Sequence, residues 1–188
     1  MTRAFTTETV DPVVINDCVE LASRSPSAGK SQGWHLLVLE GIDAKRYWDI
    51  AFPIDQRKNF VFPGLLDAPV IALSLADPGA YLSRYSEADK QGSGLGESLD
   101  AWVAPYWTID ASFATMTFLL AIEDAGFGAL FFAHANEEGL RQEFSIPDGI
   151  QILGSMAIGR PSETAARQGR SASRTRRSSA SIIHRSRW

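Results

Sequence analysis

The sequence predicts an α+β sandwich, in which helices cover a sheet. Short apolar runs of strand length alternate along the chain with longer segments whose apolar residues recur at helical spacing. The chain has 188 residues, of which 45% are hydrophobic and 21% charged, so it can form one domain with a sizeable core. The same alternation also fits a doubly wound α/β fold, and the pattern alone does not separate the two.

The first half of the chain is expected to form two helices and two buried strands. Asp11 is a favoured N-cap and Pro12 a favoured first-turn residue, so we expect a helix to begin there. This helix must stop near Ser25, because Pro26 disfavours helical backbone at the residue before it. The other expected elements are a strand at 35–39, a short helix at 43–50 and a second strand at 69–75.

The second half begins with the least regular region, residues 81–107. Its aromatic side chains suit either a lid over a ligand or packing within the core or an interface; they are Tyr81, Tyr85, Trp102, Tyr106 and Trp107. A long helix is expected at 109–125, followed by a strand at 128–133, a helix at 136–144 and a strand at 152–158. The long helix is apolar around most of its surface and therefore requires burial on several sides, which a second subunit would supply.

Several classes of protein are excluded or disfavoured by what the sequence lacks. The single cysteine, Cys18, cannot form an internal disulfide, and the first residues carry no apolar signal segment, so we expect a cytoplasmic protein. The most apolar long run, residues 113–122, is too short to span a membrane. No Cys/His cluster indicates a metal site, and no Gly-x-Gly-x-x-Gly or Walker loop indicates a Rossmann or P-loop nucleotide site.

The segment that says most about function is the loop at 25–35, between the first helix and the first strand. Its small residues would let the backbone approach a ligand closely, and its polar side chains offer hydroxyl, amide and cationic donors. Such groups suit a phosphorylated, polyhydroxylated cofactor. The same residue types are also those of an ordinary helix-to-strand turn.

The loop sequence Ser-Pro-Ser-Ala-Gly-Lys-Ser-Gln-Gly-Trp-His resembles the flavin-binding loop of the nitroreductase family, which usually reads Pro-Ser-x-x-Asn-x-Gln-Pro-Trp. Here Lys30 stands at the place of the usual Asn, and Gly33 at the place of the second Pro. Other segments resemble that family in the same order along the chain: 2–5, 10–12, 105–107, 126–129, 146–148, 158–161 and 182–188. The resemblance therefore covers nearly the whole chain.

The resemblance implies the α+β alternative, with a mixed or antiparallel central sheet, and an intertwined homodimer. Flavin mononucleotide (FMN) would lie at the dimer interface and take contacts from both chains. The implied activity is oxidation of NADH or NADPH through the flavin, with an electron-poor acceptor such as a nitroaromatic or a quinone. Two alternatives remain: a relative that fragments flavin or removes halogen, and a non-enzymatic flavin- or polyanion-binding protein. No catalytic side chain is assigned, because the cofactor carries the chemistry.

The cofactor-binding residues implied by the resemblance come from four parts of the chain. They are Arg3 near the start; Pro26, Ser27, Ala28, Gly29, Lys30, Ser31 and Gln32 in the loop; Phe132, Ala133 and His134 after the third strand; and Arg176 and Arg177 near the end. After the third strand, a backbone N–H is implied to meet the reactive edge of the flavin. The arginines are implied to meet its phosphate.

Charge divides the chain into a flavin-binding domain at 1–161 and an Arg/Ser-rich tail at 162–188. Residues 1–159 hold ten Lys and Arg against twenty-one acids, whereas residues 160–188 hold eight Arg and one acid. The tail suits a disordered arm for a polyanion, a solvated low-complexity segment, or arginines that fold back onto a phosphate. Ile182, Ile183 and Trp188 favour docking of the last segment on the domain or the partner subunit, so nucleic acid is not the expected partner. Residues 162–173 are expected to be disordered.

Overall fold

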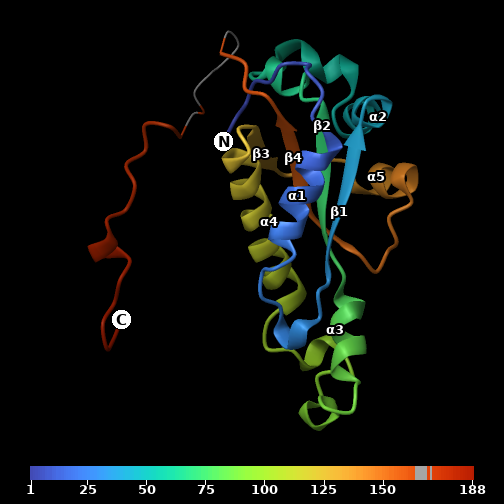
Figure 1. Ribbon diagram of the computed structural model, residues 1–188, viewed down its shortest axis with the longest axis vertical. Helices are drawn as coiled ribbons and strands as arrows, with labels where there is room; N and C mark the ends of the chain where they lie inside the picture. The colour runs from blue at the N-terminus through green and yellow to red at the C-terminus, as the bar shows by residue number, and fades with distance from the viewer. Residues whose placement is uncertain (164–168, 170) are drawn as a thin grey trace.

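The computed structural model describes residues 1–163, 169 and 171–188. Residues 164–168 and 170, within the stretch expected to be disordered, lie outside the described residues. The helices and strands, in chain order, are α1 (Pro12–Ala22), β1 (Trp34–Glu40), α2 (Ile42–Ala51), β2 (Val70–Ala76), α3 (Pro78–Tyr85), α4 (Tyr106–Asp124), β3 (Gly128–Phe132), α5 (Glu137–Phe144) and β4 (Gln151–Gly159) (Figure 1).

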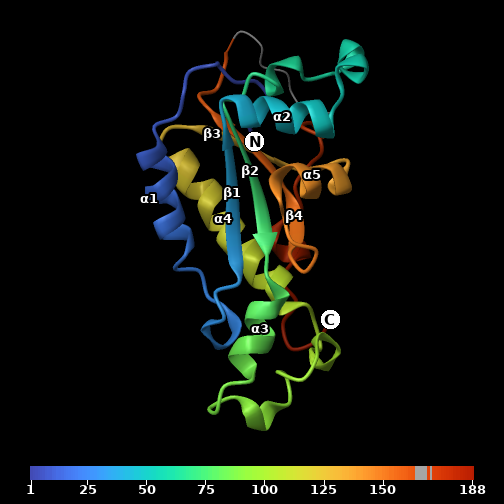
Figure 2. The same ribbon diagram turned by 90° about the vertical axis from the view of Figure 1, so that its right-hand side faces the viewer.

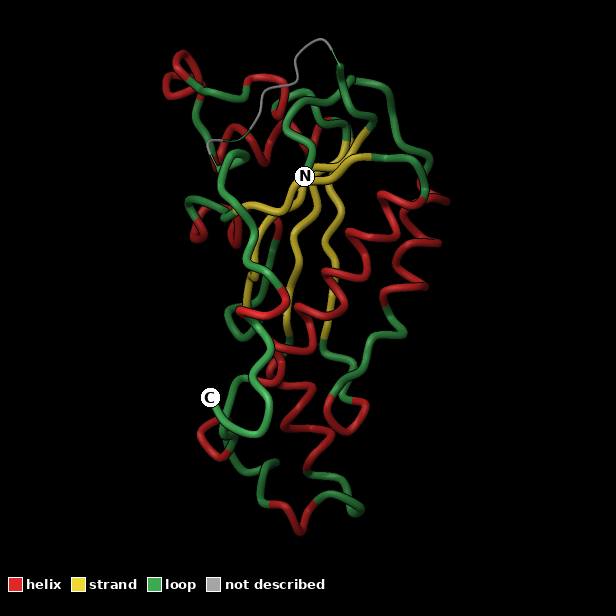
Figure 3. The backbone as a smooth tube through the Cα atoms, turned by 90° about the vertical axis from the view of Figure 1, so that its left-hand side faces the viewer, coloured by secondary structure: helices red, strands yellow, loops and turns green. Residues whose placement is uncertain are grey.

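The four strands lie side by side in one sheet (Figure 3). Their order is β1-β2-β4-β3, and every neighbouring pair is antiparallel. At one end of the sheet Trp34 lies opposite Ala76, which pairs with Gln151. At the other end Gly128 of β3 lies opposite Gly159 of β4. A doubly wound α/β fold requires a mostly parallel sheet, so this sheet confirms the α+β alternative.

Helices cover both faces of the sheet and make three layers (Figure 2). On one face α1 and α4 pack over Val70 and Ala72, and on the other α2 and α5 pack over Ile71 and Leu73. Successive residues of a strand point to opposite faces, so β2 supplies both cores at once. Every residue of β2 is buried, as expected for a central strand that is covered on both sides.

Local signals in the sequence fix the ends of several helices, among them the predicted cap at Asp11. The Asp11 side chain accepts a hydrogen bond from the Val13 N–H at the start of α1. The Asn136 side chain accepts one from the Gly139 N–H at the start of α5. Gly126 follows α4 with a φ of +82°, a conformation that glycine adopts without steric cost.

The region at 81–107 is more regular than predicted. Its first residues belong to α3, which begins after Asp77, whose side chain accepts a hydrogen bond from the Gly79 N–H. This helix and the short turns after it extend the molecule beyond the end of the sheet (Figure 1). Trp102 is 9% exposed and makes ring contacts with the other four aromatic side chains of this region. In the structure these side chains therefore pack against one another, which is the second of the two alternatives named above.

Helix α4 is buried on its sheet side and uncovered on its other side. Phe118 and Ile122 are fully buried against the sheet. Phe113, Met116 and Leu120 are 49%, 53% and 58% exposed and give α4 an apolar outer face. A row of large exposed apolar side chains on one helix is typical of a surface that another chain covers. Within the described part of the chain, no helix is long and apolar enough to cross a membrane.

Residues 171–188 of the tail run apart from the three layers (Figure 1). Ile182 and Ile183 are more than half exposed, and Trp188 is 98% exposed, stacking only on the His184 ring. The tail therefore makes no apolar docking contact with its own domain through these side chains. Docking on a partner subunit stays a prediction.

Candidate functional site

The loop between α1 and β1 has a constrained backbone. Residues Ala28–Lys30 form a single 3-10 turn. Three residues have positive φ: Gly29 at +60°, Lys30 at +60° and Gln32 at +54°. Glycine adopts such values freely, but each of the two side-chain-bearing residues costs about 1 kcal/mol or more, so the surroundings must hold the loop in this form.

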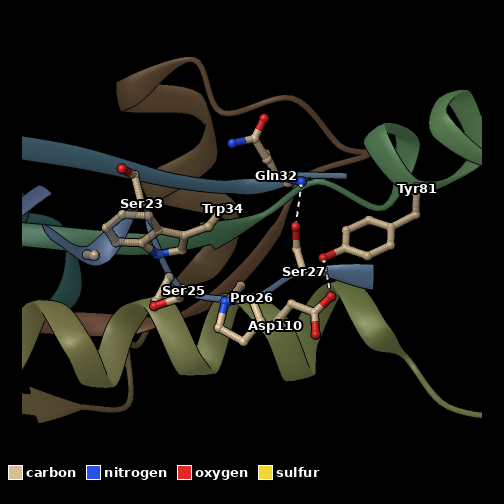
Figure 4. A pocket seen from close by; sticks show the side chains of 12 residues that line it. Ser23, Ser25, Pro26, Ser27, Gln32, Trp34, Tyr81 and Asp110 are labelled. Carbon is tan, nitrogen blue, oxygen red and sulfur yellow. Dashed lines mark hydrogen bonds between the residues drawn. The ribbon is translucent and has the colours of Figure 1, made fainter. Parts of the chain in front are cut away.

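Two serine hydroxyls bind the loop to itself. The Ser27 Oγ accepts a hydrogen bond from the Gln32 N–H at 3.1 Å (Figure 4), and the Ser31 Oγ donates to the Ala28 carbonyl at 2.7 Å. A hydroxyl has one proton to donate. The proton of Ser31 is therefore used within the loop, whereas that of Ser27 has no acceptor among the described residues. Of the two predicted hydroxyl donors, only Ser27 keeps its proton for a ligand.

Side chains from α3 and α4 hold the loop from outside. The Asp110 Oδ2 accepts hydrogen bonds from the Ala28 N–H and the Tyr81 hydroxyl, both at 2.8 Å. The Arg84 Nε donates to the Gly29 carbonyl at 2.8 Å. A Cβ on Gly29 would lie 2.8 Å from the Tyr85 ring, so this position has room for glycine alone.

The charges of these supporting groups suit their contacts. Burial, and then the hydrogen bond to Asp110, raise the pKa of the Tyr81 hydroxyl well above its usual range, so Tyr81 keeps its proton and donates it. The hydrogen bond to Asp89 raises the pKa of the Arg84 guanidinium, which therefore stays cationic. Asp89 accepts from two nitrogens of that guanidinium, at 2.7 and 2.8 Å.

A small hollow lies beneath the loop (Figure 4). Its volume is about 70 Å³, and its wall includes Ser25, Ser27, Trp34, Tyr81 and Asp110. Cofactor sites usually measure several hundred Å³, so a flavin would not fit inside it. The loop therefore supplies one wall of a cofactor site rather than a complete pocket.

A larger groove of about 450 Å³ runs along α4, on the side of β3 and β4. Its apolar lining includes Met116, Leu119, Phe131 and Ile152. This groove adjoins the uncovered face of α4, because Met116 belongs to both. It also reaches Phe131, one residue before the predicted segment at 132–134.

The segment at 132–134 lies at the end of the edge strand β3. The Phe132 ring stacks on the Trp48 ring, with centroids 5.7 Å apart and planes 4° from parallel. The His134 Nε2 lies 3.1 Å from the Glu137 Oε2, and the Arg141 guanidinium donates to the other oxygen of the same carboxyl. The hydrogen bond with His134, and then the one with Arg141, lower the pKa of the Glu137 carboxyl. The buried His134 Nδ1 has no partner among the described residues.

The predicted arginines lie away from the loop. The Arg3 guanidinium lies over the Phe62 ring, 5.5 Å from its centroid, and the adjacent Thr2 N–H donates to the Ala129 carbonyl near the start of β3. Arg177 donates to the Ser181 carbonyl within the tail, and Arg176 is exposed there.

A single chain therefore brings the seven loop residues together but separates them from the other predicted residues. The loop precedes β1, at one edge of the sheet, and the segment at 132–134 follows β3, at the opposite edge. Arg3 lies beside the start of β3, at the end of the sheet farthest from the loop. The cofactor contacts of all these residues stay predictions.

Sequence reasoning missed two residues that hold the loop, Asp110 and Arg84. Asp110 did leave a signal, because it is a lone acid beside Ala111, on the side of α4 that Ala114 and Phe118 also bury. A charged residue in a core-facing position requires a buried partner. Arg84 left no comparable signal, because arginine is common on exposed helix surfaces.

Comparisons with known proteins identify the family of the chain. A family model described as "Nitroreductase family" matches residues 1–160. A protein of Archaeoglobus fulgidus, named as a proposed NADH dehydrogenase/NAD(P)H nitroreductase, is 26% identical over 167 residues, which are 86% of this chain and 80% of the relative.

Two solved structures share the fold at 15% identity. A nitroreductase-like protein from Streptococcus mutans matches with a TM-score of 0.76, over 97% of this chain and 92% of its own. A protein from Exiguobacterium sibiricum, described as a nitroreductase in complex with FMN, matches with a TM-score of 0.74, over 97% of this chain and 91% of its own. The family model covers most of the chain, and the chain therefore belongs to the Nitroreductase family.

Proposed function

We propose that this protein is an FMN-dependent oxidoreductase that takes reducing equivalents from NADH or NADPH and passes them to an electron-poor acceptor, such as a nitroaromatic or a quinone. One observation carries the proposal: the loop at 26–32 is held in a strained conformation and has hydrogen-bond donors, at Ser27 and Lys30, that have no acceptor among the described residues. Strained backbone persists at sites where a ligand makes use of it. The family and its FMN-containing structural neighbours support the identity of that ligand.

The residues present fit a flavin nucleotide. The Ser27 hydroxyl has a proton to donate, and the side chains of Lys30 and Gln32 are exposed beside it. Lys30 has no ion-pair partner among the described residues, so its ammonium is available to an anionic group such as a phosphate. When bound, FMN would supply the hydride-accepting and hydride-donating chemistry.

The complete site would need two chains. In a two-fold dimer through the outer face of α4, the loop of one chain would approach the groove beside Met116 and Phe131 of the other. The size of the two hollows supports this arrangement, because the small one under the loop cannot hold a flavin and the larger one adjoins the uncovered face of α4. The separation of the loop from the segment at 132–134 within one chain supports it as well.

The chain itself would position the reactants and exclude water. In such a dimer, the loop would bind the polar part of the nucleotide, and the groove would hold the planar ring system against apolar side chains. His134, with its ring oriented by Glu137, would lie just beyond β3, two residues after Phe132. Arg3, and Arg176 and Arg177 of the tail, would supply cations for the phosphate.

Reconstitution with FMN tests the proposal. The purified protein should bind FMN and turn yellow, the colour should bleach when NADH or NADPH is added without oxygen, and a quinone or nitroaromatic should restore it. Failure to bind FMN at micromolar concentration would contradict the proposal. Binding without bleaching by either nicotinamide would favour the non-enzymatic flavin-binding alternative.

A further inference from the structure

Asp110 is a buried carboxylate that none of the expected cofactor contacts includes. It is 7% exposed, and its Oδ2 accepts from the Ala28 N–H and the Tyr81 hydroxyl, both at 2.8 Å. A carboxylate this deep in a protein is unfavourable unless donors satisfy it. Here one donor is the loop backbone and the other is the side chain that packs beside the loop, so Asp110 serves the loop rather than the core.

We propose that Asp110 is a positioning residue for the flavin-binding loop. By holding the Ala28 N–H, it fixes the 3-10 turn at Ala28–Lys30 and with it the direction of the Lys30 side chain. It would act through the loop backbone, without touching the cofactor. This inference rests on the proposed function, because it assumes that the loop binds flavin.

The loop needs such an anchor because its own bonds are few. Two of its residues other than glycine have positive φ, and the turn is only three residues long. A short turn with this strain relaxes unless contacts from outside over-determine it. The Ala28 N–H is the first donor of the turn, so losing its acceptor would release the turn at its start.

The position of Asp110 on α4 adds a consequence for the dimer. Met116 lies on the outer face of the same helix and is exposed, whereas Asp110 faces the loop (Figure 4). The helix that would meet the partner chain thus also holds the binding loop. A partner that covers this helix would stabilise the loop at the same time.

Three variants separate a positioning role from a merely structural one. Asp110→Ala removes the acceptor, whereas Asp110→Asn keeps one oxygen that can accept from both the Ala28 N–H and the Tyr81 hydroxyl, and removes only the negative charge. Ile122→Ala is the matched control, because Ile122 is also buried on α4 but lies near the other end of the helix, away from the loop and the groove. Each variant would be titrated with FMN by fluorescence, unfolded in urea, and examined by visible circular dichroism of the bound flavin.

The expected order of FMN affinity is clear. Asp110→Ala should bind FMN about tenfold to hundredfold more weakly, whereas Asp110→Asn should recover most of that loss. Ile122→Ala should stay within about threefold of the unmodified protein, even if it loses as much stability. The visible circular dichroism should change for Asp110→Ala alone, because only there does the environment of the flavin change.

If Asp110→Ala does not fold, Tyr81→Phe takes its place, because it removes one of the two donors and should weaken FMN binding by about threefold to tenfold. Binding within threefold for both Asp110→Ala and Tyr81→Phe would overturn the inference. Equal losses of affinity in Asp110→Ala and Ile122→Ala, at equal loss of stability, would overturn it too. Failure of the unmodified protein to bind FMN would instead overturn the proposed function, and the inference with it.

Discussion

Replacing Gly29 by alanine should destabilise the loop more than the same change at another glycine with similar backbone angles. Gly29 has a φ of +60°, and a Cβ there would lie 2.8 Å from the Tyr85 ring. Gly94 has a φ of +71°, and its Cβ would meet nothing closer than 3.9 Å. Gly94→Ala is therefore the matched control, with the same backbone penalty and no collision.

The expected magnitude follows from these two effects. Left-handed backbone costs alanine about 1–2 kcal/mol relative to glycine, at either position. Overpacking at Gly29 adds about 1–3 kcal/mol, because the Tyr85 ring must move. The free energy of unfolding should therefore fall by about 1–3 kcal/mol more for Gly29→Ala than for Gly94→Ala.

Urea unfolding gives this difference directly, and FMN titration should show weaker binding for Gly29→Ala alone. Adding Tyr85→Ala to Gly29→Ala relieves the collision and should return part of the lost stability. Equal losses for the two glycine variants would refute the reasoning, because they would show that the Tyr85 ring does not constrain the loop.

Four further outcomes are expected. Ser27→Ala should weaken FMN binding by about fivefold to tenfold, whereas Ser31→Ala should chiefly lower stability, because its proton is used within the loop. Met116→Arg should convert a dimer to a monomer by light scattering at micromolar concentration, and a monomeric unmodified protein would contradict the dimer. Truncation after Pro161 should weaken FMN more than riboflavin, which has no phosphate; unchanged flavin binding with lost retention on nucleic acid would indicate a polyanion-binding arm instead. Burial raises the pKa of Tyr47 to about 12, so the unfolded chain loses this proton first; Tyr47 should then contribute a fall in stability of about 1.4 kcal/mol per pH unit between pH 10 and 12 in urea titrations, and Tyr47→Phe should reduce the slope by that amount, leaving the contribution of Tyr81.

Much of the fold was predictable because its signals are local. The caps at Asp11 and Asn136 act within two or three residues of themselves, and a glycine after a helix acts on its own backbone. Helix α3 was missed for a related reason. Pro78 and Gly79 at its start, and Tyr81 and Tyr85 along it, are residue types that are common in loops. Apolar periodicity also identified the strands, since each lies within one or two residues of its predicted bounds.

The loop at 26–32 was predictable as a ligand-binding candidate from its residue types alone. Its support was not, because Asp110 and Ala28 are 82 positions apart and Arg84 and Gly29 are 55 apart. Composition records that these side chains exist, but only the path of the chain decides which backbone groups they meet. Geometry likewise decides that the Ser31 hydroxyl proton is bonded within the loop, whereas the Ser27 hydroxyl proton is not.

The sequence by itself determined the four strands and the four helices other than α3, the acidic domain with its basic tail, and the family resemblance. Only the tertiary structure decided that the sheet is antiparallel in the order β1-β2-β4-β3, and that the loop and the segment at 132–134 lie at opposite edges of it. The physical reason is that strand order depends on contacts summed over the whole core, whereas a turn or cap depends on a few neighbouring residues. The uncovered apolar face of α4 is decided by the tertiary structure for the same reason, because it depends on which side of that helix is buried against the sheet.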